Sequence, residues 1–124
     1  MTNNFFSAVF FDMDGLFVDS EPLWLEAETE LMRDAKYEWT HADQVACLGG
    51  PLNRVGQYMS DKSGGKFSGP EYHEKIIDLM VEKLSAAVSL MPGSLELAQE
   101  LTATGVPTAL VSASPRIIVD AVFE

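Results

Sequence analysis

Two short apolar runs, each ending in a polar residue, place the strongest limit on how this chain can fold. The first, Ser7–Phe11, leads into Asp12, and the second, Pro107–Val111, leads into Ser112. Nearly continuous apolar runs of this length are typical of strands buried on both faces of a parallel sheet that helices cover. The carboxyl ends of such strands are where open α/β sheets place their ligands.

The sequence between the two runs has helical patterning. Ser20 is the expected N-cap of the first helix, and Ser68 with Glu71 forms a capping box. Helices are predicted near residues 21–36, 41–48, 52–62, 69–88 and 94–104, and from 116 onward. Because the helix over 94–104 leads directly into the second strand, as in a βαβ unit, the stretch from Leu16 to Ser89 is expected to be a helical insertion.

The charge balance excludes several classes of partner. The chain has 19 acidic and 8 basic residues, a net charge of -11. A surface this acidic repels nucleic acid and anionic lipid, and no apolar run approaches the roughly 20 residues that a membrane span needs. The start, Met1–Asn4, lacks the features of a signal peptide, and the single Cys47 forbids an internal disulfide. We therefore expect a cytoplasmic protein with no nucleic-acid or membrane partner.

The segment Asp12-Met13-Asp14-Gly15 carries the chemistry at the end of the first strand. Carboxylates two residues apart point the same way if the strand geometry continues, and Gly15 permits a sharp exit. Paired carboxylates suit a hard divalent cation such as Mg²⁺. With the metal present, one Asp can attack phosphorus and the other can donate and recover a proton.

The spacing alone leaves other interpretations of this segment open. An Asp-Gly pair between apolar stretches is also a strong hairpin signal, so Asp14 and Gly15 could form a simple turn. A calcium loop starting at Asp12 fits poorly, because Trp24 stands where that loop needs Glu. Asp19 and Glu21 could also extend an acidic cluster that only keeps the surface solvated.

Two stretches resemble motifs of the haloacid dehalogenase-like superfamily. VFFDMDGLFVDSEP, residues 9–22, is similar to the family's first motif, in the form found in its sugar-phosphatase and β-phosphoglucomutase branch. ALVSASP, residues 109–115, resembles its second motif, and MPG, residues 91–93, resembles the approach to it. The resemblance implies an incomplete Rossmann-like α/β core, residues 1–15 and 90–124, with an inserted α-helical cap, residues 16–89.

The resemblance also implies roles for individual residues. Asp12 would be the nucleophile and a Mg²⁺ ligand, and Asp14 would be the general acid and base with its backbone carbonyl on the metal. Ser112 and the backbone N–H of Ala113 would bind the transferring phosphoryl group. Dehalogenases of the family lack a carboxylate at the place of Asp14, which favours phosphoryl transfer. From the residues alone, the favoured interpretation is that Ser112 and Ser114 only cap the next helix.

Two further motifs of the family, a lysine and a later acidic pair, would lie beyond Glu124. We therefore expect either that the chain is a C-terminally truncated piece of a protein of roughly 200 or more residues or that it self-associates through uncovered sheet edges. The chain alone is expected to show little or no turnover. The lysine would neutralise charge during transfer, and the acidic pair would complete the metal site.

The most favoured function is that of a Mg²⁺-dependent phosphatase acting on a small phosphorylated substrate, expected to be a sugar phosphate, through an aspartyl phosphate. A phosphomutase of the same family is the first alternative. Some relatives carry an arginine in the segment after the second helix, where this chain has Pro51 with Arg54 offset, which weakens that alternative. The second alternative is a non-catalytic helical interaction module.

Overall fold

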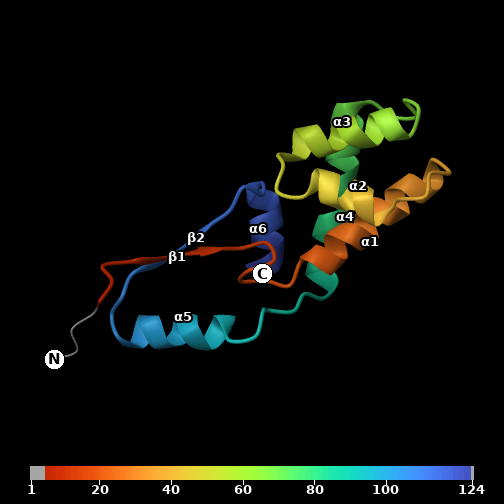
Figure 1. Ribbon diagram of the computed structural model, residues 1–124. Helices are drawn as coiled ribbons and strands as arrows, with labels where there is room; N and C mark the ends of the chain where they lie inside the picture. Colours follow the sequence, from red (N-terminus) through yellow and green to blue (C-terminus); the bar gives the residue numbers. More distant parts are fainter. Residues whose placement is uncertain (1–4, 124) are drawn as a thin grey trace.

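The computed structural model describes residues 5–123, so the predicted core's residues 1–4 and 124 lie outside the described residues. Within this range the element order is strand, five helices, strand, helix, as predicted from the sequence (Figure 1). The elements are β1 (Val9–Asp12), α1 (Glu21–Asp34), α2 (His41–Cys47), α3 (Leu52–Lys62), α4 (Gly69–Ala86), α5 (Ser94–Ala103), β2 (Thr108–Val111) and α6 (Arg116–Phe123).

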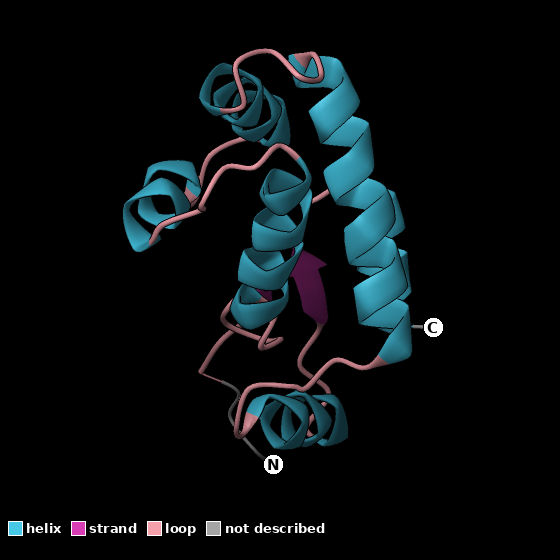
Figure 2. Cartoon of the chain, turned by 90° about the vertical axis from the view of Figure 1, so that its right-hand side faces the viewer, coloured by secondary structure: helices cyan, strands magenta, loops and turns pink. Residues whose placement is uncertain are grey.

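The two strands form a parallel sheet in which Val9 lies opposite Thr108 and Asp12 lies opposite Val111. This register brings the carboxyl ends of β1 and β2 to the same edge, so residues that follow the two strands become neighbours. Figure 2 shows the strands among the helices that make up most of the chain. The fold is α/β with parallel strands, which confirms the expected incomplete Rossmann-like core.

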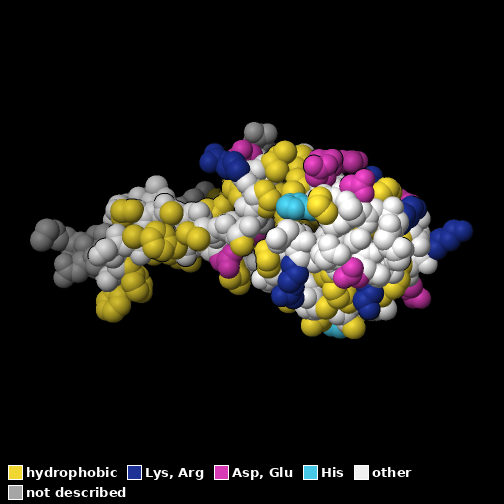
Figure 3. All heavy atoms as spheres, turned by 90° about the horizontal axis from the view of Figure 1, so that it is seen from above, with side chains coloured by type: hydrophobic (Ala, Val, Ile, Leu, Met, Phe, Trp, Pro, Cys, Tyr) yellow, Lys and Arg dark blue, Asp and Glu magenta, His cyan; other side chains and the backbone are white. Residues whose placement is uncertain are grey.

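Only one face of this sheet is covered by the described residues, whereas the apolar runs predicted burial on both faces. Phe11 and Leu110 pack against the core, but Phe10 is 72% exposed and Val111 is 56% exposed. Figure 3 shows hydrophobic side chains on the surface of the end of the molecule near the N-terminus. The apolar pattern correctly predicts the two strands, but burial of both faces also depends on a second layer, which residues 5–123 do not provide.

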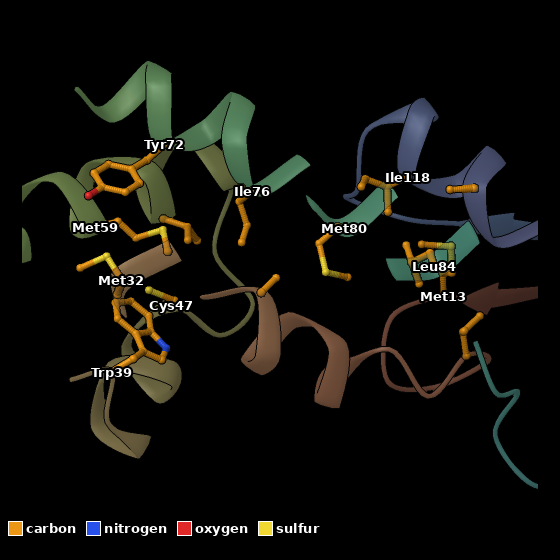
Figure 4. Packing of buried hydrophobic residues seen from close by; sticks show 14 of the residues in the cluster. Met13, Met32, Trp39, Cys47, Met59, Tyr72, Ile76, Met80, Leu84 and Ile118 are labelled. Carbon is orange, nitrogen blue, oxygen red and sulfur yellow. The ribbon is translucent and has the colours of Figure 1, made fainter. Parts of the chain in front are cut away.

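One continuous apolar cluster joins the helical part of the chain to the sheet. Met32, Met59 and Tyr72 are fully buried between α1, α3 and α4, and Met13 is fully buried next to the sheet. Figure 4 shows Met13 near Leu84 of α4 and Ile118 of α6, which connect the two regions. The core therefore holds the loop after β1 in place relative to the helices. No helix within 5–123 is long and apolar enough to cross a membrane.

Candidate active site

The loop after β1 is anchored by Met13, which stands between the two aspartates in the sequence and whose side chain is fully buried in the apolar core. The chain then folds back, with the Phe17 N–H donating to the Asp12 carbonyl across 3.1 Å and the Val18 N–H donating to the Met13 carbonyl across 3.0 Å. Gly15 has φ +76°, a conformation that other residues rarely adopt. Since β1 pairs with β2 in parallel, Asp14 and Gly15 do not form the hairpin that their sequence also allowed.

Four side chains donate hydrogen bonds to the Asp14 carboxylate. The Ser20 hydroxyl and the Trp24 indole N–H reach Oδ1 at 2.9 and 3.2 Å. The Ser114 hydroxyl reaches Oδ2 at 2.6 Å, and the Ser112 hydroxyl lies 3.4 Å from the same oxygen, a weak contact. Asp14 is therefore oriented both by the start of α1 and by the loop after β2.

The prediction that Ser20 is the N-cap residue of α1 is confirmed, but its side chain has another role. It occupies the N-cap position, but its hydroxyl makes no capping bond and donates to Asp14 instead. The hydrogen bonds from Trp24 and Ser114 to Asp14 were not predicted from the sequence either. The spacing of Ser20 and Trp24 was a usable signal, because residues four apart lie on the same face of a helix.

The four residues predicted for the site, Asp12, Asp14, Ser112 and Ala113, line one pocket of about 370 Å³. Ser112 directly follows β2, and its hydroxyl oxygen accepts a hydrogen bond from the Ser114 backbone N–H across 3.0 Å. The structure therefore brings together residues about 100 positions apart in the sequence, as the parallel pairing of the strands requires.

The pocket has two ends of different character. The sheet end holds the two aspartates and residues 111–114, and the helical end is formed by side chains and backbone of α1, α2, α3 and the loop between α2 and α3. The residues of the helical end are Glu28, Gln44, Cys47, Leu48, Gly49, Gly50, Leu52 and Val55. A ligand could therefore place one group at the sheet and the remainder among the helices.

Two further carboxyl groups line the pocket. Burial raises the pKa of Glu21, and the negative charges of Asp14 and Asp19 raise it further. Burial raises the pKa of Glu28 to about 7; the hydrogen bond from Trp39 opposes this shift, and the charge of Glu21 adds to it. The pocket is thus strongly acidic, which favours a cation or a bridging metal beside any bound phosphate.

The donor set at the sheet end fits Mg²⁺. Mg²⁺ is usually held by one or two carboxylates together with substrate phosphate and water. The Asp12 side chain is exposed to the pocket, and within 5–123 no backbone N–H donates to the Asp14 carbonyl oxygen. Both groups could hold the ion. Within the same range no cluster of three or more acidic, histidine or cysteine side chains could do so without other ligands.

Comparison with known proteins agrees with this geometry. The family model described as haloacid dehalogenase-like hydrolase matches residues 9–124. Hexitol phosphatase B of Escherichia coli is 30% identical over 112 residues, which cover 87% of this chain and 50% of the relative. The chloroplastic protein SUPPRESSOR OF QUENCHING 1 of Arabidopsis thaliana is 33% identical over 118 residues, covering 93% of this chain and 11% of that protein.

The solved structures show the same fold. A putative β-phosphoglucomutase from Thermotoga maritima matches with a TM-score of 0.72 at 21% identity, over 95% of this chain and 55% of that one. The chain thus spans about half the length of hexitol phosphatase B and of this structure. With a family model that matches from β1 to the end, the chain belongs to the haloacid dehalogenase-like hydrolase family.

Proposed function

We propose that the protein is a Mg²⁺-dependent phosphatase that hydrolyses a small phosphorylated metabolite through an aspartyl phosphate. The observation that carries the proposal is the single pocket lined by Asp12, Asp14, Ser112 and Ala113. Two carboxylates and a hydroxyl at the ends of adjacent parallel strands supply a nucleophile, a proton carrier and a phosphate-binding group.

In the first step an oxygen of the Asp12 carboxylate attacks phosphorus and the bond from phosphorus to the leaving oxygen breaks. Asp14 gives its proton to that oxygen, so the alcohol leaves neutral. In the second step water attacks the phosphorus of the aspartyl phosphate, Asp14 takes a proton from the water, and inorganic phosphate and the Asp12 carboxylate are restored. The hydrogen bonds from Ser20, Trp24 and Ser114 keep Asp14 in position for both transfers.

Ser112 and the N–H of Ala113 bind the phosphoryl group in this proposal. Both precede α6, and free N–H groups with the helix dipole favour an anion near a helix start. Bound Mg²⁺, held by the Asp12 carboxylate and the Asp14 carbonyl oxygen, supplies positive charge against the phosphate oxygens.

The helical part of the chain is proposed to act as a cap, residues 16–89, on a core of residues 1–15 and 90–124. Support comes from the pocket, to which residues of both segments contribute. A sugar phosphate is the proposed substrate, because the relative from Escherichia coli is named a hexitol phosphatase. We also propose that the protein works in the cytoplasm.

A phosphomutase is the second candidate, supported by the fold shared with the putative β-phosphoglucomutase. Arg54 gives this candidate little support, because its guanidinium donates to the Ala46 carbonyl across 2.9 Å and its side chain is not part of the pocket lining. Analysis of the products distinguishes the two: a phosphatase releases inorganic phosphate, whereas a mutase keeps it on the sugar.

The test uses the protein expressed from its own gene and measures phosphate release in the presence of Mg²⁺. Asp12→Asn should lower turnover by about a thousandfold or more, because it removes the nucleophile. Asp78→Asn, an exposed carboxylate on α4, is the matched control and should change nothing. If Asp12→Asn has no effect on a measured activity, or if no phosphate ester is turned over, a non-catalytic helical interaction module becomes the better description.

The exposed sheet face around Phe10 and Val111 is proposed to be covered in the working protein, by further residues of the same polypeptide or by a second copy. Intact and native mass of the protein from its own gene separate these possibilities. An intact mass near 13.6 kDa with twice that native mass means self-association. A larger intact mass means that the polypeptide contains further residues, which supports their covering the sheet.

A further inference from the structure

The helical end of the pocket contains a carboxyl group that the proposed reaction does not use. Glu28, on α1, is only 5% exposed, and it lines the pocket. Its Oε2 accepts a hydrogen bond from the Trp39 indole N–H across 2.9 Å. Within residues 5–123 no donor reaches Oε1. One oxygen is therefore fixed, and the other is available to a ligand.

The partner of Glu28 is itself held firmly. Trp39 is buried, and its ring packs edge-on against Tyr37 and Tyr58, with centroids 6.3 and 5.7 Å apart. Both tyrosine hydroxyls donate to Asp43 of α2. The Glu28 carboxyl group thus has a preorganised position, as a group that selects a ligand must have.

The charge of the pocket lining indicates what this end can accept. Among the described residues that line the pocket, four are acidic, namely Asp12, Asp14, Glu21 and Glu28, and none is Lys or Arg. At the helical end Glu28 and Gln44 are the polar side chains, and the rest are apolar or glycine. A second phosphate or a carboxylate bound there would face a carboxyl group with no cation from these residues to offset it.

We propose that Glu28 is a specificity-determining residue, whose free carboxyl oxygen hydrogen-bonds a hydroxyl group of the substrate and whose place in the pocket excludes a second anionic group. The substrates selected are monophosphates of polyols or neutral sugars, rather than bisphosphates or phosphorylated carboxylic acids. This inference rests on the phosphatase function proposed above.

Glu28 can discriminate between ligands because a buried polar group that a ligand leaves without a hydrogen bond weakens binding of that ligand. A site with a buried polar group discriminates strongly against ligands that leave this group unpaired. With its pKa near 7, Glu28 is present in both protonation states around neutral pH and can either donate to or accept from a hydroxyl group.

The experiment compares sorbitol 6-phosphate with 6-phosphogluconate, which have the same chain length but differ in a terminal carboxylate. It uses the protein from its own gene, with p-nitrophenyl phosphate as a substrate that has no hydroxyl group to recognise. Wild type should prefer sorbitol 6-phosphate by at least about tenfold in kcat/KM. Glu28→Gln, which keeps the shape but removes the charge, should lower this preference, the ratio of the two kcat/KM values, about tenfold.

Glu30→Gln is the matched control, since Glu30 lies on the same helix outside this pocket, and it should leave the preference unchanged.

The inference is wrong if Glu28→Gln keeps the wild-type preference while p-nitrophenyl phosphate is turned over normally. If wild type hydrolyses none of the three esters, the proposed phosphatase function fails instead. In that case the Kd values of sorbitol 6-phosphate and 6-phosphogluconate still test Glu28, and an equal ratio of these two Kd values in wild type and in Glu28→Gln overturns the inference. Should Glu28→Gln fail to fold, Glu28→Asp gives the same comparison, because it withdraws the carboxyl group from the ligand.

Discussion

The Trp24 indole N–H donates to Oδ1 of Asp14 across 3.2 Å, and so α1 directly orients the proposed general acid and base. The Ser20 hydroxyl reaches the same oxygen from the N-cap position of α1, four residues before Trp24. Any movement of α1 relative to the sheet therefore changes the position of the Asp14 carboxyl group. The helical part of the chain and the reacting groups are linked through these two bonds.

Trp24→Phe tests this link, because it removes the N–H and keeps a large aromatic ring. We expect kcat to fall about five- to tenfold with KM changed less than twofold, since Asp14 loses one positioning bond while an aromatic ring still lines the pocket at this position. Steady-state kinetics with p-nitrophenyl phosphate measure both constants. Tyr58→Phe, which removes a hydroxyl bound to Asp43 rather than to Asp14, is the control. If the fall in kcat is fully explained by a smaller fraction of folded protein, as measured by urea denaturation, Trp24 has only a structural role.

A second network, around Asp43, is expected to stabilise the helical part. Burial alone would raise the pKa of Asp43, but hydrogen bonds from the Thr40 backbone, Tyr58, the Thr40 hydroxyl and Tyr37 outweigh it and lower the pKa to about 2. An acid with a lowered pKa contributes stability above its usual pKa and loses it as the pH falls towards the folded value. Asp43→Asn should cost about 1–3 kcal/mol at pH 7.

Urea denaturation at pH 7 and at pH 3 checks this prediction. The difference between wild type and Asp43→Asn should shrink at the lower pH, where the unfolded Asp43 is mostly protonated. Asp61→Asn, an exposed carboxylate on α3, should behave as wild type. A difference that is constant between the two pH values would contradict the role assigned to the ionised carboxylate.

Local side-chain chemistry predicts where helices begin. The capping box of Ser68 and Glu71 forms as expected, with the Ser68 N–H 2.7 Å from Glu71 Oε2. An equivalent box at Thr40 and Asp43 was not predicted, although the same side-chain logic applies with the shorter acid. Both capping boxes join residues three apart, so the local sequence is sufficient to predict them.

The hydrogen-bond partners of Asp14 show why contacts between distant parts of the chain could not be predicted from the sequence. Ser114 reaches it from 100 positions away, and this contact exists only because the two strands pair in parallel with one particular register. The aspartates themselves were predicted because their spacing and the strand before them are local. Exposure of Phe10 was not predicted, because hydrophobicity indicates a preference for burial and not whether another layer is present.

The contact between α3 and α4 has no room for a side chain at Gly56. A Cβ placed there would lie 2.4 Å from the Gly69 carbonyl oxygen and 3.1 Å from the His73 nitrogen, both backbone atoms. Gly56→Ala must therefore separate the two helices and should cost on the order of 1–3 kcal/mol or more. Thermal unfolding measures the loss, with Gly50→Ala as control because its Cβ would meet only ordinary contacts from Arg54 and Cys47. Equal melting temperatures for both variants would show that the helices can adjust.

Stability of the wild-type protein should decrease as the pH rises through neutrality, because of Glu28. Its pKa is raised from 4.5 to about 7, so the folded state holds this proton more tightly than the unfolded state does. A raised carboxyl pKa contributes stability that is complete below about pH 4.5 and is lost as the pH rises through about 7. The loss should be on the order of 3 kcal/mol. Glu28→Gln cannot ionise, so denaturation curves between pH 5 and 8 should show a smaller decrease for this variant, whereas Glu30→Gln should follow wild type. Parallel curves for wild type and Glu28→Gln would mean that Glu28 ionises without cost in the folded protein.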